Sequence, residues 1–257
     1  MDIVLIGSGN TATVIGRKSI AAGHRILQVY SRNGNHANLL ANRLGATSTT
    51  YISTIERKAD LMIIALRDKA IRPFAEALGP IQYTAVHTAG AIPTSDISGI
   101  SPSHGALYPL QSLRKEIEHM PPLTILLDGN NTGTRSHIKA FATTIAESLL
   151  EADDNTRLKY HLAATLVNNF TNHLFAMAAS FCEKENISFT VLQPLMEETV
   201  LRLRTVSPLE TQTGPAIRND LVTLRKHRDL LKAYPVILSF YEKFSEEIQK
   251  TALSFTL

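Results

Sequence analysis

The sequence predicts an α/β domain built on a doubly wound parallel sheet, followed by an all-α domain. In the first part of the chain, short apolar runs typical of buried strands alternate with segments whose apolar residues recur at helical spacing. From about Asp153 onward only helical patterns are found. Strand–helix alternation is typical of parallel sheets with helices on both faces. We therefore expect one domain over residues 1–153 and an all-helical domain over residues 154–257.

The element ranges follow from the same periodicities. The predicted strands are Ile3–Ile6, Ile26–Tyr30, Leu61–Leu66, Thr84–His87 and Thr124–Leu127, with a short extra strand near Ser48–Ile52. The helices between them are Asn10–Ala22, His36–Leu44, Lys69–Leu78 and Thr132–Leu150. The second domain contains Leu158–Glu183, Phe189–Val206, Ile217–Leu231 and Val236–Leu253. The segment of residues 103–111 is interpreted as a long irregular connection.

Composition excludes several classes of protein. The 257 residues are 44% hydrophobic and 19% charged, which is typical of a globular protein. A net charge of +3 is too small to indicate a nucleic acid or an anionic membrane as partner. No apolar run approaches the roughly 18 residues of a membrane span, and no signal peptide is recognisable. The single Cys182 excludes an intramolecular disulfide. We expect a cytoplasmic protein that acts on a small molecule.

The N-terminal segment is basic and free of acids. No Asp or Glu occurs between Ile3 and Ile55. The basic residues there are Arg17, Lys18, His24, Arg25, Arg32, His36 and Arg43. Such a segment suits a ligand that carries several phosphates.

A glycine turn, "IVLIGSGNTA", follows the first predicted strand. Gly7 permits the tight turn, Gly9 lets a diphosphate approach the backbone, and Ala12 lets helix and strand pack closely. The helix that begins next offers free N–H groups to phosphate. The turn predicts a Rossmann dinucleotide site that includes Gly7, Ser8, Gly9, Asn10 and Thr11.

The end of the second strand indicates which dinucleotide is bound. NAD-selective sites usually place an acid there, but this chain has Ser31 and Arg32. A hydroxyl and a guanidinium would hold a 2′-phosphate. The alternative is a solvated loop arginine. We predict NADP(H), with Leu66 and Arg67 lining its ribose side.

Polar residues also follow the strand Thr84–His87. His87, Thr88 and Gly90 are expected beside the cofactor, because sites in open α/β sheets lie at the carboxyl ends of strands. His87 could donate a proton or serve as a structural histidine. Among substrate contacts we expect His104 and Tyr108, and from a later polar loop Gln212 and Thr213, which could equally be surface or capping residues.

The segment 159–175 carries an unusual polar face. At about 100° per residue, His161, Thr165, Asn168 and Asn172 share a strip of about 60° on a helix. Asparagine is a poor helix former, so its repetition needs a reason. One reason is a hydrogen-bonding wall that faces the substrate, and the alternative is a satisfied polar seam inside a bundle or dimer interface. The sequence predicts no metal site.

The chain resembles a bacterial family of Rossmann-like proteins with a C-terminal helical domain of unassigned function, whose members are often labelled NADP oxidoreductases. The matching segments are "GSGNTA", "HTAGAIP", "LYPLQS", "HLAATLVNNFTNHLFA", "PLMEET" and "QTGPAIRND". The family is similar in architecture to pyrroline carboxylate reductase, β-hydroxyacid dehydrogenases and deazaflavin-dependent NADP reductases. The resemblance implies NADP binding and a homodimer formed through the helical domain.

One departure concerns the catalytic lysine. The β-hydroxyacid dehydrogenases have a lysine four residues before an asparagine, whereas Thr165 precedes Asn169 and Asn168 precedes Asn172 here. We predict an NADPH-dependent reductase of a small C=O or C=N compound, with His161 as the proton donor, His87 as the other candidate, and Asn168 and Asn172 facing the substrate. The alternative is a non-catalytic NADP-binding sensor or scaffold, which the missing lysine favours.

Overall fold

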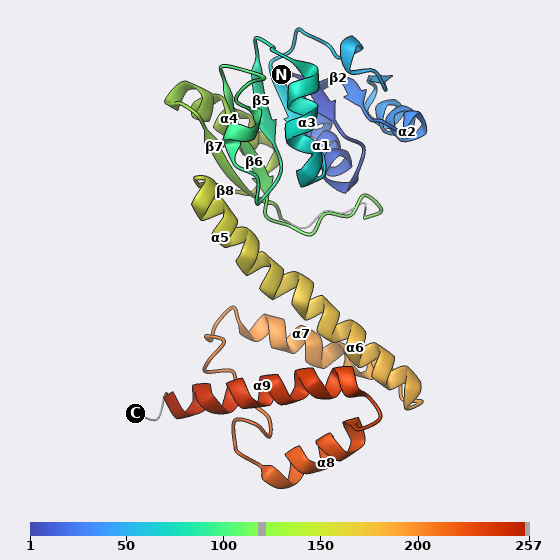
Figure 1. Cartoon of the computed structure of the whole chain (residues 1–257), viewed down its shortest axis with the longest axis vertical. Coiled ribbons are helices and arrows are strands. Elements are labelled where there is room, and N and C mark those ends of the chain that lie inside the picture. The colour runs from blue at the N-terminus through green and yellow to red at the C-terminus, as the bar shows by residue number, and fades with distance from the viewer. Residues whose placement is uncertain (118–121, 255–257) are drawn as a thin grey trace. The chain divides into compact units, whose positions relative to one another are not determined.

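The computed structural model describes residues 1–117 and 122–254, and the chain divides into two compact units, Met1–Phe170 and Thr171–Leu257 (Figure 1). The sequence places a boundary at 153/154, where a long helix begins. The division between the compact units falls further along that helix, so its first turns belong with the sheet.

The first unit is built on one sheet in the order β3-β2-β1-β4-β5-β6-β7-β8. Strands β1 to β6 run parallel, β7 is antiparallel to β6, and β8 is parallel to β7. The strand order reverses between β1 and β4, which is where open α/β sheets bind their ligands. The observed fold confirms the predicted class, with two strands of opposite direction added at one edge. The strands are β1 (Asp2–Ile6), β2 (Arg25–Tyr30), β3 (Thr47–Thr49), β4 (Leu61–Ile64), β5 (Thr84–His87), β6 (His104–Pro109), β7 (Thr124–Gly129) and β8 (Ser148–Glu151).

Helices cover both faces of this sheet (Figure 1). Alternate residues of a strand face opposite sides, so Ile3 and Leu5 join one core while Val4 and Ile6 join the other. The first core contains residues of α1, α2 and α4, and the second contains residues of α3. Burial on both faces explains why the central strands are continuous apolar runs. The helices of this part are α1 (Asn10–Ala21), α2 (Gly34–Leu44), α3 (Asp68–Leu78) and α4 (Thr132–Ile145), with short 3-10 turns η1 (Ile52–Thr54) and η2 (Thr94–Ile97).

Two predicted elements were wrong. Residues 104–109 form β6 rather than an irregular connection. Its Gly105 suggested a loop, yet a Cβ there would lie 2.1 Å from the Asp128 carbonyl oxygen, so the glycine allows close approach of β7. The helix predicted to reach Leu150 ends at Ile145, because the following residues pair with β7 as β8.

The remaining helices are a continuous helical segment formed by α5, η3 and α6, followed by α7, α8 and α9. The helix predicted over 158–183 is longer and contains a π turn, η3, between α5 and α6. α8 begins later than predicted, because the Asp220 side chain caps it by accepting from the Thr223 N–H (3.0 Å). Within the described residues, no helix combines the length and apolar character needed to cross a membrane. The elements are α5 (Asp154–Ala164), η3 (Thr165–Phe170), α6 (Thr171–Lys184), η4 (Phe189–Leu192), α7 (Gln193–Arg202), α8 (Leu221–Leu231) and α9 (Pro235–Ser254).

Candidate functional site

The first glycine of the turn between β1 and α1 is required by the backbone conformation and packing of the folded chain. Gly7 has a φ of +114°, a conformation that other residues rarely adopt. A Cβ on Gly7 would also lie 2.3 Å from the Ala65 carbonyl oxygen. The turn therefore needs glycine at this position for backbone geometry and for contact with the end of β4.

The second glycine has no such requirement. Gly9 has a φ of −83°, and no described atom lies within 4 Å of the position where its Cβ would be. Gly9 caps α1, whose N-terminus has no side-chain cap and no acid in the first turn among the described residues. Exposed backbone and free N–H groups at a helix N-terminus are suited to an anionic group.

A cavity of about 810 Å³ opens in front of this turn. Seven predicted cofactor residues line it: Gly7, Ser8, Gly9, Ser31, Arg32, Leu66 and Arg67. Asn10 and Thr11 are the first two residues of α1, where their N–H groups lie at its N-terminus. His36, one of the basic residues of the N-terminal segment, also lines it, and the structure adds Asn33 and Lys69, which the sequence motifs did not single out.

The polar lining of this cavity fits a phosphorylated nucleotide. The Ser8 hydroxyl donates to Ser31 Oγ (2.8 Å), which joins the first turn to the end of β2. No Asp or Glu is found among the described lining residues, whereas Arg32, Arg67 and Lys69 are cationic. A diphosphate fits the backbone at Gly9, and a 2′-phosphate fits the hydroxyl and guanidinium groups after β2.

A second cavity, of about 530 Å³, lies beside the carboxyl end of β6 and the helix α5. Tyr108, His161 and Asn168, which the sequence selected, all line it. Thr165 and Asn169 line it as well, but Asn172 does not. A π turn contains an extra residue, so the helical strip predicted for Asn172 does not continue through η3. The other lining residues are Leu110, Gln111, Ser112, Tyr160, Ala163, Ala164 and Val167.

Tyr108 and His161 form a pair in this cavity. The Tyr108 hydroxyl and His161 Nδ1 are hydrogen-bonded at 2.9 Å, and the two rings meet edge to face. Burial and the negative charge of Asp68 raise the pKa of Tyr108, so its phenol stays protonated. Gly90 makes room for the pair, since a Cβ there would lie 2.6 Å from His161 Nδ1. The size of Gly90 is thus explained by His161 packing against it.

An ion pair anchors α5 to the loop that follows β5. Asp154 accepts from the Thr94 N–H (3.1 Å) and from Arg157 Nη2 (2.7 Å). Arg157, only 1% exposed, also donates from Nη2 to the Ile92 carbonyl (2.5 Å). Asp154, Arg157 and His161 follow each other at helical spacing on one face of α5. The anchor therefore fixes the helix that carries His161.

His87, at the end of β5, is fully buried. The Ala89 N–H donates to His87 Nδ1 (3.2 Å), so the neutral ring carries its proton on Nε2. Burial, followed by the positive charge of Arg157, lowers the pKa of His87 to about 4. Neighbouring Thr88 is also buried, and its hydroxyl donates to the Ile64 carbonyl (3.4 Å).

The other predicted substrate residues lie at the far end of β6 or in the second compact unit. His104 begins β6, at the opposite end of the strand, and its Nδ1 lies 2.9 Å from the Ser101 carbonyl oxygen. Gln212 and Thr213 belong to the helical unit, where Gln212 donates to the Thr213 carbonyl (3.0 Å). Residues 1–117 and 122–254 contain no group of three or more His, Cys, Asp or Glu that could hold a metal ion.

Comparison with known proteins identifies the family. Residues 2–86 match the family model "NADP oxidoreductase coenzyme F420-dependent", and residues 123–248 match a domain of unknown function, DUF2520. A solved structure from Bacteroides fragilis, provisionally described as an NADP oxidoreductase, is 35% identical over 97% of this chain and 98% of its own, with a TM-score of 0.91. The chain belongs to this family. Membership of the NADP oxidoreductase family confirms the resemblance drawn from the sequence and the predicted cofactor, NADP.

More distant structures share the fold of this chain. The 1-pyrroline-5-carboxylate reductase of Streptococcus pyogenes is 14% identical, with a TM-score of 0.61 over 97% of this chain and 98% of that one. A reductive aminase of Aspergillus terreus, solved with NADPH and ethyl-5-oxohexanoate, is 17% identical, with a TM-score of 0.73 over 99% of both chains. Among curated protein sequences no match was found.

Proposed function

We propose that the protein is an NADPH-dependent reductase that transfers a hydride to a small C=O or C=N compound. The observation that supports this most directly is the hydrogen-bonded pair Tyr108–His161, which lines a cavity at the same carboxyl edge of the sheet as the nucleotide cavity. A cofactor cavity and a proton-donating pair at one sheet edge are the two parts that a reductase needs.

The cofactor would be bound by residues that follow the carboxyl ends of β1 and β2. Backbone N–H groups at Gly9–Thr11 would bind the diphosphate, and Ser31 and Arg32 would bind the 2′-phosphate. Leu66 and Arg67 would line its ribose side, with His87, Thr88 and Gly90 near the nicotinamide. NADPH, when bound, supplies the hydride.

The proton would come from His161. As an imidazolium, His161 would donate from Nδ1 to the Tyr108 hydroxyl oxygen and pass its Nε2 proton to the substrate's oxygen or nitrogen, which leaves a neutral ring. His87 is the weaker candidate, because burial keeps it neutral and away from solvent. Hydride on carbon and a proton on the heteroatom together complete the reduction.

Asparagine side chains would orient the substrate. Asn168 lines the cavity with His161, and Asn169 and Gln111 add further amides that can donate to a carbonyl or accept from an amine. His104 does not line this cavity, and Asn172, Gln212 and Thr213 belong to the second compact unit, so all four are retained as sequence-based proposals. The proposed substrate class agrees with the names of two proteins of similar fold, a pyrroline carboxylate reductase and a reductive aminase.

The test is NADPH oxidation against a panel of keto acids, aldehydes and cyclic imines. We expect turnover with at least one compound, a loss of about a hundredfold or more in kcat for His161→Ala, and a smaller loss for Tyr108→Phe. Because Asn168→Ala should raise KM more than it lowers kcat, it separates orientation from proton transfer. Arg32→Ala should weaken NADPH and leave NADH unchanged.

A non-catalytic NADP sensor or scaffold is the second candidate, and the absent lysine favours it. Tight NADPH binding without turnover on any compound, unchanged by His161→Ala, would support the sensor and contradict the reductase.

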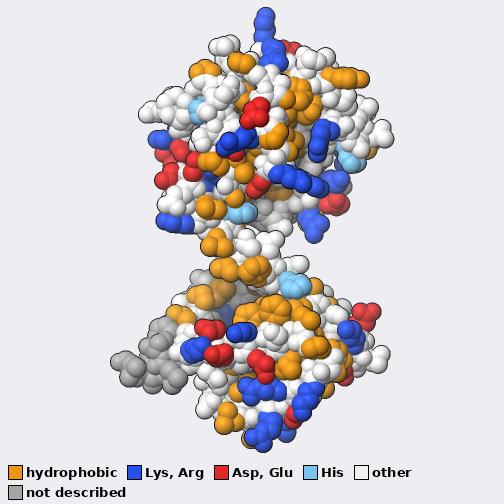
Figure 2. Space-filling view, in the orientation of Figure 1, with side chains coloured by type: hydrophobic (Ala, Val, Ile, Leu, Met, Phe, Trp, Pro, Cys, Tyr) orange, Lys and Arg blue, Asp and Glu red, His pale blue; other side chains and the backbone are white. Residues whose placement is uncertain are grey.

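We also propose a cytoplasmic homodimer formed through the helical region, residues 154–257. Figure 2 shows hydrophobic side chains exposed on the surface of the helical unit. The exposed large hydrophobic side chains of this unit include Val191, Leu195 and Val200 around α7, and Val236, Phe240 and Phe244 on α9. Exposed apolar surface of this extent is typical of an interaction site. The single Cys182, unable to form an intramolecular disulfide, suits a reducing compartment.

A further inference from the structure

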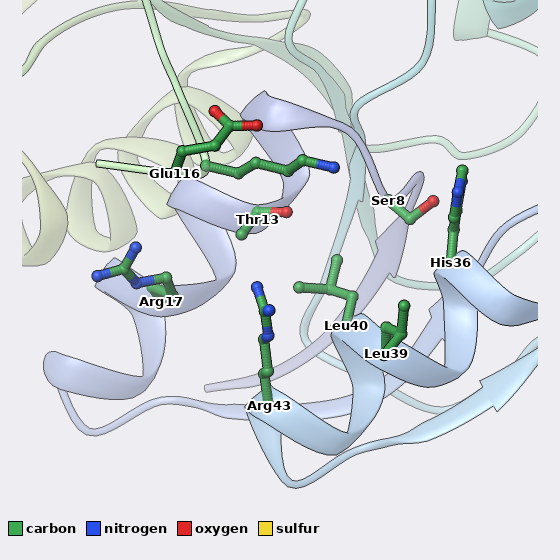
Figure 3. Close-up of a pocket in the computed structure, with 9 residues that line it drawn as sticks. Ser8, Thr13, Arg17, His36, Leu39, Leu40, Arg43 and Glu116 are labelled. Atoms are coloured by element: carbon green, nitrogen blue, oxygen red, sulfur yellow. The ribbon is translucent and has the colours of Figure 1, made fainter. Parts of the chain in front are cut away.

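A basic cavity of about 540 Å³ lies between α1 and α2, next to the glycine turn (Figure 3). Four segments form it. Thr13 and Arg17 come from α1, and the segment after β6 supplies Lys115 and Glu116. From α2 come His36, Leu39, Leu40 and Arg43, and Ser8 of the glycine turn completes the lining.

The charges in this cavity are unbalanced. Among the described lining residues Arg43 and Lys115 are cationic and Glu116 is the one carboxylate, and no acid occurs between Ile3 and Ile55. Arg17 also donates to the Ile117 carbonyl (3.2 Å), so the proposed ligands of this cavity are Arg43 and Lys115. Arg43 and Lys115 form no ion pair within the described part of the chain. The cavity is therefore a concentration of positive charge with room for a ligand.

The lining also offers neutral contacts suited to an anion. Leu40 is buried beneath the cavity, and such apolar surroundings strengthen the attraction between a cation and an anion. Figure 3 shows Ser8 and His36 at one end and Arg17 and Arg43 at the other. Ser8 and His36 line the cofactor cavity as well, so the two cavities share a wall.

We propose that this cavity binds a phosphate group, with Arg43 and Lys115 as its principal ligands and His36 and Ser8 at the wall shared with the cofactor cavity. Two sources fit the same chemistry. One is the 2′-phosphate of NADP, which Arg43 and Lys115 would then hold in addition to Ser31 and Arg32, a source that rests on the proposed function. The other is a separate phosphorylated small molecule that binds beside the cofactor.

The first experiment measures binding of inorganic phosphate by calorimetry to the full chain. Arg43→Gln and Lys115→Gln should each lower the affinity about tenfold, because each removes one charge-assisted hydrogen bond. Lys58→Gln is the matched control. It makes the same charge change at an exposed residue outside both cavities, and should bind phosphate as the wild-type protein does.

The second experiment separates the two sources by measuring NADPH and NADH affinities of the same variants. If the group is the cofactor's 2′-phosphate, Arg43→Gln lowers the affinity for NADPH about tenfold and leaves NADH unchanged. If it belongs to another molecule, both nucleotides bind Arg43→Gln normally, and phosphate still binds the NADPH-saturated wild-type protein.

The proposal is overturned if wild-type and variant chains do not differ in phosphate affinity and the NADPH-to-NADH affinity ratio is also unchanged. This outcome can be distinguished from one that contradicts the proposed reductase function. Normal NADPH binding that Arg32→Ala weakens would leave the proposed function intact, whereas a wild-type chain that binds phosphate but no NADPH would contradict the reductase alone.

Discussion

Two glycines of one turn illustrate how differently the same residue can be constrained. Gly7 is fixed by its φ of +114° and by the Ala65 carbonyl, whereas Gly9 meets no described atom within 4 Å. The fold constrains Gly7, whereas Gly9 would be constrained only by the proposed diphosphate.

This difference predicts opposite outcomes for matched alanine variants. Gly7→Ala should lower the free energy of unfolding by about 2 kcal/mol or more, because it adds both backbone strain and a clash. Gly9→Ala should change that free energy by less than about 1 kcal/mol. Its NADPH affinity should nevertheless fall about tenfold or more, as the methyl group occupies the diphosphate's approach. Urea unfolding and calorimetry measure the two effects, and equal NADPH affinity for wild type and Gly9→Ala would contradict the proposed cradle.

The buried His87 predicts a pH dependence of stability. Its pKa of about 4 in the folded protein lies below the ordinary value of 6.5, so the unfolded chain binds the proton first. The stability it contributes is complete above pH 6.5 and is lost as the pH falls towards 4. By pH 5 the loss should be about 2 kcal/mol.

His87→Gln should remove this part of the pH dependence when urea unfolding is compared at pH 7.5 and pH 5. The control His36→Gln changes an exposed histidine and should retain the wild-type slope. An unchanged slope in His87→Gln would show that His87 does not carry the effect.

Among elements, α5 depends on its anchor to the loop after β5. Asp154→Ala would leave the buried guanidinium of Arg157 without its carboxylate and the Thr94 N–H without an acceptor. We expect a loss of about 3 kcal/mol in the free energy of unfolding. Asp229→Ala, which breaks an exposed pair with Lys232, should cost less than about 1 kcal/mol. Similar losses for the two variants in urea unfolding would argue against the anchor.

Elements with a continuous apolar run or a clear helical periodicity could be predicted from the sequence. Elements that form only by pairing with adjacent strands could not. The fully apolar Leu61–Ile64 and the periodic α1 and α2 appear close to their predicted ranges. β6 was missed because Gly105 and Pro109 are typical of loops, although pairing with β5 and β7 makes the segment a strand. The polar strip ending at Asn172 assumed a regular helix, and the π turn of η3 is not visible in periodicity.

For the whole molecule, the exposed apolar side chains of the helical unit predict self-association. Val191 and Leu195 are 75% and 64% exposed, which is costly in water for large aliphatic groups. Sedimentation should show a dimer for the wild-type chain and a shift to monomer for Leu195→Asp. Tyr51→Asp, at a residue 71% exposed in the first unit, should leave the dimer intact. A monomeric wild-type chain would contradict the proposed dimer.

By itself the sequence determined the fold class and the glycine turn and predicted NADP as the cofactor, because each inference rests on residues close together in the chain: apolar periodicity, Gly7 to Ala12, and Ser31 with Arg32. Only the tertiary structure decided that Tyr108 meets His161, that Arg157 anchors α5, and that Arg43 and Lys115 line one basic cavity with the glycine turn. These contacts join residues from separate elements. They arise when strands pair and helices pack, and spacing along the chain carries no record of them.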